Sequence, residues 1–302
     1  MHRSRFVFLF PILLLSACQS NAQPVILLTA PANPTLPPSE TPAPTLVPSV
    51  TPVDCMTLPG SVVTGELPTD DKPPQQFVVY LPPCYQQHTD SHFPVLYLLH
   101  GQTSTDTQWV SLGAPQAADQ LIRSGKATPF IMVFPDDRYW NLTAGSGFGD
   151  RLIHEIIPYI DQNFRTLTDR HDRALGGLSR GGAWAVHILL TRYDLFGSIG
   201  LHSPVIFDDD AAVLDRLMQA IPTNAWPRLW VDAGDRDGGL GKVEAFETLL
   251  TAYEIPHEWR MYTGDHTNPY WQAHVSEYLQ WYADGFAAGF GQAPSATATA
   301  TP

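Results

Sequence analysis

The sequence has few charged residues, and cationic residues are the scarcer kind. Charged side chains make up 16% of the 302 residues, and 17 Lys and Arg face 30 Asp and Glu, which gives a formal net charge of −13. No stripe or cluster of Lys and Arg offsets this acidic balance. Because nucleic-acid binding depends on basic side chains that neutralise phosphates, we expect no nucleic-acid partner.

A long apolar run and a metal-binding motif are also lacking. The apolar stretch from Phe6 to Leu15 is too short to cross a bilayer. His154-Glu155 begins like the helix of a zinc protease, but Pro158 stands where the second histidine is required. We therefore expect no metal ion and no cofactor.

Cysteine is scarce, and each of the three cysteines has a predicted role. Cys18 ends the tetrapeptide Leu-Ser-Ala-Cys, which resembles the lipobox of bacterial lipoproteins; residues 1–17 would then be the signal peptide. An ordinary signal peptide with a chance cysteine is the alternative. Cys55 and Cys84 remain as an even pair in an oxidising compartment, so we predict a disulfide, with two free buried thiols as the alternative.

These features predict an extracytoplasmic protein that is lipid-anchored to a bacterial membrane through Cys18. Residues 18–53 are rich in Pro, Thr, Ser and Ala and almost free of charge, so we expect a disordered tether. Residues 289–302 have the same character and should form a disordered tail. Residues 54–288 suit a single α/β domain, whose oligomeric state the sequence leaves open.

Within this domain, strand-like runs alternate with stretches whose apolar residues recur at helical spacing. We expect strands at Phe77 to Leu81, Val95 to His100, Phe130 to Pro135, Arg173 to Leu178, Ser198 to Leu201, Arg228 to Ala233 and His257 to Tyr262. We expect helices at Ala114 to Ser124, Asp150 to Asn163, Gly182 to Arg192, Ala211 to Ile221 and Val243 to Tyr253. Because several strands are apolar throughout, the pattern predicts an α/β three-layer sandwich, a mostly parallel sheet with helices on both faces.

The connection between Leu201 and Arg228 is too short to hold a large cap domain over the strand ends. The active site should therefore be open to solvent. An open site favours a polymeric or bulky substrate over a buried lipid chain.

A candidate nucleophile lies in the pentapeptide Gly-Leu-Ser-Arg-Gly at 177–181, between a predicted strand and a predicted helix. Ser179 would sit on the sharp turn of a nucleophile elbow, where Gly177 and Gly181 leave room that a Cβ would fill. A glycine-rich turn that happens to contain serine is the alternative.

His266 is the predicted general base, because it follows a strand on a loop from which an imidazole can reach Ser179. His257, at a strand start, and His274, inside the last helix, are weaker candidates. The acid that orients His266 should be a loop carboxylate beyond the preceding strand, which favours Asp237. Asp235 is the next candidate and Asp232 the last.

The tetrahedral intermediate of acyl transfer needs two backbone N–H donors. The amide of Arg180 directly follows the nucleophile, and Gln102 follows His100-Gly101 at the end of a strand, with Thr103 as the alternative. We expect His100 to be structural and to support this loop. Aromatic residues on loops after strand ends could stack on a substrate or pack in the core: Trp109, Tyr139, Trp140, Tyr270 and Trp271.

Several segments resemble, in the same order, those of the esterase family that includes esterase D, bacterial feruloyl esterases and the antigen 85 mycolyltransferases. They are Val79 to Pro83, Pro94 to Gly101, Glu155 to Ile160 and Arg173 to Ser179. The resemblance implies an α/β-hydrolase fold and carboxylic-ester hydrolysis through an acyl-serine. The family's Gly-x-x-Asp motif falls on Gly234 to Asp237, which favours Asp237, and its histidine loop falls on Gly264 to His266.

Arg180 departs from the family, whose members often carry an apolar residue after the serine. Its guanidinium could pair with a substrate carboxylate or with Asp237. The leading hypothesis is a serine esterase acting on acylated carbohydrate or another exposed ester. The alternatives are an acyltransferase that uses the same acyl-serine and a non-catalytic surface binding module on a hydrolase scaffold.

Overall fold

The computed structural model describes residues 54–68, 74–137 and 147–290. The predictions for the signal peptide, Cys18, the tether, the tail beyond residue 290, Tyr139 and Trp140 fall outside these residues. Among the helices that are described, none combines the length and the apolar character needed to cross a membrane.

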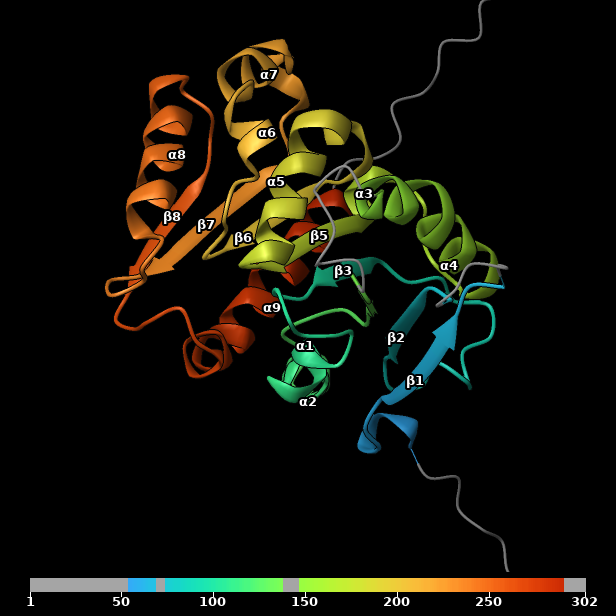
Figure 1. The fold of residues 1–302 in the computed structure, drawn as a ribbon. Coiled ribbons are helices and arrows are strands. Elements are labelled where there is room, and N and C mark those ends of the chain that lie inside the picture. The colour runs from blue at the N-terminus through green and yellow to red at the C-terminus, as the bar shows by residue number, and fades with distance from the viewer. Residues whose placement is uncertain (1–53, 69–73, 138–146, 291–302) are drawn as a thin grey trace, which may run out of the picture. The chain divides into compact units, whose positions relative to one another are not determined.

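An eight-stranded sheet forms the centre of the fold, in the order β1-β2-β4-β3-β5-β6-β7-β8 (Figure 1). The strands are β1 (Ser61–Glu66), β2 (Gln76–Leu81), β3 (Val95–Leu99), β4 (Ile131–Pro135), β5 (Arg173–Leu178), β6 (Ser198–His202), β7 (Arg228–Gly234) and β8 (Glu258–Tyr262). β2 pairs antiparallel with β1 and β4, and every other pair is parallel. The predicted mostly parallel sheet is confirmed.

The apolar composition of the central strands reflects burial on both faces. β3, β4, β5 and β6 are buried at every position. The sequence did not predict β1. Nearly all of its side chains are exposed, and its residues form neither the apolar run nor the alternating pattern that indicates a strand. It is recognisable only from its pairing with β2.

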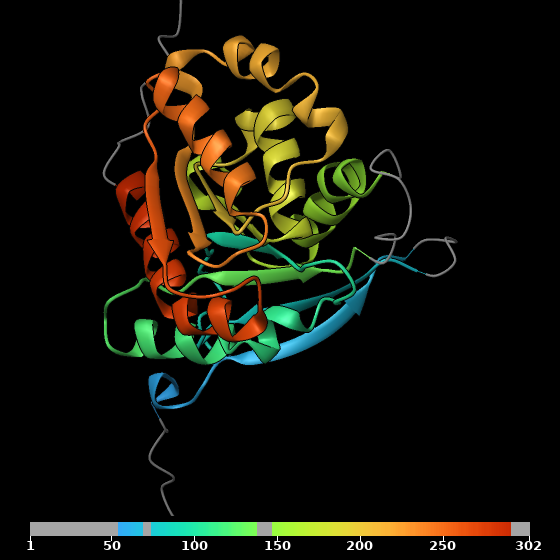
Figure 2. The same ribbon diagram turned by 60° about the vertical axis from the view of Figure 1, so that its left-hand side comes forward.

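Helices cover both faces of the sheet (Figure 2). One apolar cluster holds side chains of α1 (Gln108–Ser111), α2 (Ala114–Arg123) and α9 (Asn268–Phe290). The other holds side chains of α3 (Phe148–Arg151), η3 (Leu152–Ile156), α4 (Ile157–Asn163), α5 (Arg180–Arg192), α7 (Leu214–Ala220) and α8 (Leu240–Ala252). The helices on both faces bury the sheet between them, as predicted.

Two expected helices are interrupted. The stretch predicted from Asp150 to Asn163 contains a π-helical turn, η3, just before Pro158. Because proline has no N–H to donate to the carbonyl four residues earlier, regular α-helical bonding cannot run through this point. The stretch predicted from Ala211 to Ile221 contains only the last residue of α6 (Asp208–Ala211) and then, after a break, the whole of α7.

The predicted disulfide between Cys55 and Cys84 is present, with the two Cα atoms 5.1 Å apart. It joins the 3-10 turn η1 (Cys55–Thr57) to the chain that follows β2. The two sulfur atoms also lie near His88. Since both are joined in the disulfide, they are not available as thiolate ligands for a metal ion.

Candidate active site

Ser179 occupies a sharp turn between β5 and α5. Its φ of 55° and ψ of −116° lie in a region that non-glycine residues rarely adopt. A Cβ on Gly177 would come within 2.1 Å of the Gly181 carbonyl oxygen, and one on Gly181 within 2.3 Å of the Leu99 carbonyl oxygen. The turn therefore needs glycine at both positions, and it holds the serine at the carboxyl end of the sheet.

Three side chains from separate loops meet in one line of hydrogen bonds. The Ser179 Oγ lies 2.7 Å from Nε2 of His266, and Nδ1 of His266 lies 2.7 Å from Oδ2 of Asp237. With Nδ1–H donating to the carboxylate, Nε2 is free to accept the serine proton. This is the geometry of a nucleophile, a base and an orienting acid.

The carboxylate of Asp237 is fixed by its own loop. Its side chain is 1% exposed, whereas that of His266 is 34% exposed. Its Oδ1 accepts the Gly239 N–H at 2.7 Å, which leaves Oδ2 for His266. The base is therefore accessible to a substrate while the acid behind it is shielded from water.

The two other candidate acids have different partners. Asp235 accepts the Gly264 N–H at 2.9 Å, and its own N–H donates to the Tyr262 carbonyl at 2.7 Å. The Arg236 N–H donates to the Gly264 carbonyl at 3.0 Å. Asp235 thus fastens the acid loop to the histidine loop.

Asp232 lies in β7 and is fully buried. Its carboxylate accepts four hydrogen bonds, from His202 Nδ1, Trp230 Nε1 and the hydroxyls of Tyr270 and Tyr278. Burial, together with the charge of Asp232, raises the pKa of both tyrosines far above the usual value, so their hydroxyls remain protonated donors. This network anchors the start of α9 directly after the histidine loop.

The loop after β3 lies against the nucleophile. A Cβ on Gly101 would be 3.6 Å from the Cβ of Ser179. Gln102 and Thr103 are exposed, and Thr103 has a φ of 65°. The Arg180 amide, the other proposed donor, is at the first residue of α5, where helix N–H groups lack intrahelical acceptors.

His100 is buried beneath this loop, and its contacts are those of a structural residue. Nδ1 lies 2.7 Å from the Gly101 carbonyl, and Nε2 accepts the Asp137 N–H at 2.7 Å. Nδ1 therefore carries the proton. His100 joins the end of β3 to the end of β4.

Within the protein, the Arg180 side chain pairs with Asp137 and not with Asp237. Its Nε donates to Oδ2 of Asp137 at 2.8 Å, and the Trp184 indole N–H donates to the same oxygen at 2.7 Å. Both charged groups are buried. Sequence reasoning missed Asp137, because nothing in the sequence marks a partner 43 positions before Arg180.

The expected substrate contact at Trp109 is wrong. Its side chain is 1% exposed and its indole N–H donates to the Leu99 carbonyl at 3.0 Å, so it packs in the core. Trp271 is also buried, but its ring meets His266 edge-on with the centroids 5.0 Å apart. Tyr270 is buried in the Asp232 network.

The remaining histidine candidates bond elsewhere. His257 Nδ1 bonds to the Ile255 carbonyl at 2.8 Å, and Nε2 lies 3.3 Å from a Glu247 oxygen. His274 stacks on Tyr262 with a centroid distance of 3.9 Å. Neither ring is placed to act on Ser179.

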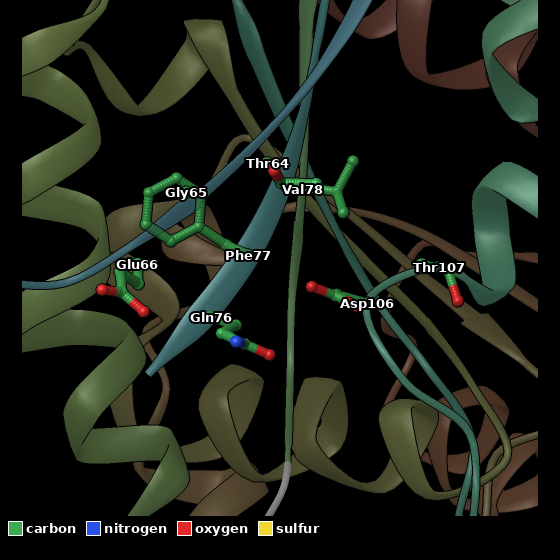
Figure 3. A pocket seen from close by; sticks show the side chains of 8 residues that line it. All are labelled: Thr64, Gly65, Glu66, Gln76, Phe77, Val78, Asp106 and Thr107. Carbon is green, nitrogen blue, oxygen red and sulfur yellow. The ribbon is translucent and has the colours of Figure 1, made fainter. Parts of the chain in front are cut away.

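A pocket of about 440 Å³ opens beside β1 and β2 (Figure 3). The residues that line it are Thr64, Gly65, Glu66, Gln76, Phe77, Val78, Asp106 and Thr107. The last two belong to the loop that follows β3. Since no triad residue lines this pocket, we assign the chemistry to the partly exposed surface around Ser179 and His266.

The sequence model of the family described as "Putative esterase" matches residues 72–282. An endo-1,4-beta-xylanase/feruloyl esterase of Xylanibacter ruminicola is 39% identical over 189 residues, which cover 58% of this chain and 24% of that protein. An S-formylglutathione hydrolase of Paracoccus denitrificans is 24% identical over 258 residues, covering 70% of this chain and 88% of that protein.

A ferulic acid esterase of known structure superposes with a TM-score of 0.66 at 24% sequence identity, covering 75% of this chain and 98% of that one. The similarity establishes the α/β-hydrolase fold that the resemblance implied. The chain spans less than a third of the length of several curated relatives that it matches: the matched regions cover 24%, 30% and 28% of three of these proteins.

Proposed function

Because the chain belongs to the Putative esterase family, we propose that it is a serine carboxylic-ester hydrolase that works through an acyl-serine intermediate. The observation that carries this proposal is the hydrogen-bonded line from Ser179 through His266 to Asp237, with 2.7 Å at both steps. The strained backbone at Ser179 supports it, because such strain persists mainly where function requires it.

In the proposed reaction, Ser179 Oγ attacks the ester carbonyl carbon while His266 Nε2 takes the hydroxyl proton. The oxyanion of the tetrahedral intermediate accepts the N–H groups of Gln102 and Arg180. His266 then gives its proton to the alcohol oxygen as the C–O bond breaks. A water molecule, deprotonated by His266, hydrolyses the acyl-serine and restores the free hydroxyl.

The proposed substrate is an acylated carbohydrate or another exposed ester. The exposure of His266 supports a substrate that approaches from solvent. The name of the Xylanibacter ruminicola relative, which joins a xylanase to a feruloyl esterase, supports an aromatic acyl group on a polysaccharide.

A panel of nitrophenyl esters with acetyl, butyryl, feruloyl and octanoyl groups tests this proposal, with the full chain and its Ser179→Ala variant side by side. We expect turnover that depends on the serine and is highest for the feruloyl ester. Equal turnover by the alanine variant would show that another group carries out the hydrolysis. Release of nitrophenol with acyl transfer to an added sugar would instead establish an acyltransferase.

We also propose that the protein is exported and lipid-anchored through Cys18. The lipobox-like sequence supports this location, and so does the disulfide, since disulfides persist outside the reducing cytoplasm. Expression in bacteria fed a labelled fatty acid should label the full chain and not its Cys18→Ser variant. A labelled serine variant would contradict the assignment.

A further inference from the structure

One buried side chain holds the loop that passes over Ser179. Gln108, at the start of α1, is 9% exposed, and its Oε1 accepts the Gly101 N–H at 2.7 Å. A buried carboxamide with a short hydrogen bond to a backbone amide fixes the direction of that peptide.

The same side chain also reaches the histidine side of the site. The Gln108 Nε2 donates to Oδ1 of Asn268 at 2.8 Å, across 160 positions of sequence. Asn268 is the first residue of α9 and comes two positions after His266. Gln108 therefore bridges the loop after β3 and the segment that carries the base.

Both backbone polar groups of Gly101 are engaged. Its N–H bonds to Gln108, and its carbonyl accepts from the Ser104 N–H at 3.2 Å and lies 2.7 Å from His100 Nδ1. The Gly101 amide is thus not available to an oxyanion. The next amide along the chain is that of Gln102, and none of the described residues accepts a hydrogen bond from its N–H.

We propose that Gln108 is a positioning residue for the oxyanion hole: it holds the Gly101 peptide so that the Gln102 N–H faces the oxygen of the carbonyl group that Ser179 attacks. The proposal rests on the proposed ester hydrolysis and adds a residue to it. Gln108 acts through Gly101 and Asn268 and does not itself touch the substrate.

A neutral carboxamide suits this role, because it accepts one hydrogen bond and donates another at the same time. A carboxylate at position 108 could still accept from Gly101, provided that the Asn268 amide turns its NH₂ toward it. A carboxylate at position 268 could still accept from Gln108. Carboxylates at both positions would repel each other unless they shared a proton.

The contrast between one carboxylate and two at positions 108 and 268 defines a matched set of variants of the full chain. They are Gln108→Leu, Gln108→Glu, Asn268→Asp and the double variant Gln108→Glu/Asn268→Asp. For each, kcat and KM are measured on a nitrophenyl ester, together with the Ki of a trifluoromethyl ketone. This inhibitor forms a tetrahedral adduct with the serine, so its affinity reports on the oxyanion hole.

We expect Gln108→Leu to lower kcat by about 10- to 100-fold and to weaken the ketone by a similar factor, with KM almost unchanged. The two single carboxyl variants should keep kcat within about threefold of the wild type. The double variant should lose as much as Gln108→Leu at neutral pH. As the pH falls, the kcat of the double variant relative to that of the wild type at the same pH should rise again, because acid supplies the proton that the two carboxylates share.

Unchanged kcat and Ki in Gln108→Leu would overturn the proposal, and so would a lower melting temperature without a change in either constant. If that variant does not fold, the double variant decides, because equal activity of the single and double carboxyl variants at every pH would also overturn it. An inactive wild type would instead reject the ester hydrolase, which keeps the two failures distinct.

Discussion

The Arg180 guanidinium and the Asp137 carboxylate form a buried ion pair beside the nucleophile, with Nε and Oδ2 2.8 Å apart. The pair joins the first residue of α5 to the chain that follows β4. The positive charge beside Ser179 is therefore neutralised within the protein.

Replacing Arg180 should affect stability more than substrate choice. The variant Arg180→Ala leaves the Asp137 carboxylate buried without its cation, which should lower the free energy of unfolding by about 3 kcal/mol. Urea denaturation measures this change. The ratio of kcat/KM between a neutral ester and one with an acyl carboxylate should not move, and a selective loss on the anionic ester would assign Arg180 to substrate binding.

The acid of the triad can be tested with a neighbouring control. Asp237→Asn should lower kcat on nitrophenyl acetate by about 10⁴-fold, because the amide no longer holds His266 in the required tautomer. Asp235→Asn keeps an oxygen that can accept the Gly264 N–H, so it should retain kcat within about threefold. The reverse order of losses would make Asp235 the acid.

The buried carboxylate of Asp232 should be important for stability. Asp232→Ala leaves four donors without an acceptor and should lower the free energy of unfolding by at least about 4 kcal/mol. Tyr278→Phe, which removes one donor and leaves the carboxylate with three, should cost about 1 kcal/mol. Similar losses in the two variants would contradict a network centred on the carboxylate.

A histidine on α5 makes stability depend on pH. The hydrogen bond from His187 to Asp210, 2.9 Å long, raises the pKa of His187, and the charges of Asp210 and Asp150 add to this effect while burial opposes it. Because the pKa is higher in the folded state, the stabilisation is fully present below the unfolded value of about 6.5 and is lost as the pH rises through the folded value.

We therefore expect His187→Gln to lower the free energy of unfolding more at about pH 5.5 than at about pH 8.5. The side chain is 37% exposed, so solvent screening should keep the difference below about 1 kcal/mol. Denaturant titrations at the two pH values measure it. A loss that is larger at high pH would contradict the assigned direction.

Features that depend on a local sequence pattern could be predicted from the sequence. Continuous apolar runs indicated the central strands, and Gly177 and Gly181 marked the turn that exposes Ser179. The choice of Asp237 came from its position beyond a strand and from the family's Gly-x-x-Asp motif, and the structure brings it to His266. In each of these cases, neighbouring residues in the chain also determine the local geometry.

Relationships between distant segments could not be read in the same way. Trp109 follows a strand end like a surface aromatic, yet the chain turns it into the core. Asp137, in the loop after β4, and Gln108, at the start of α1, are ordinary polar residues, and only their partners, Arg180 and Gly101, give them a role. Such contacts depend on how the loops at one edge of the sheet come together, which no local pattern records.

The central claim is that Ser179 is the nucleophile. The most direct measurement is the intact mass of the full chain after reaction with a fluorophosphonate, followed by mapping of the labelled peptide. We predict one phosphonyl group per chain, located on Ser179 and absent from the Ser179→Ala variant. A label on another residue, or equal labelling of the alanine variant, would contradict the account.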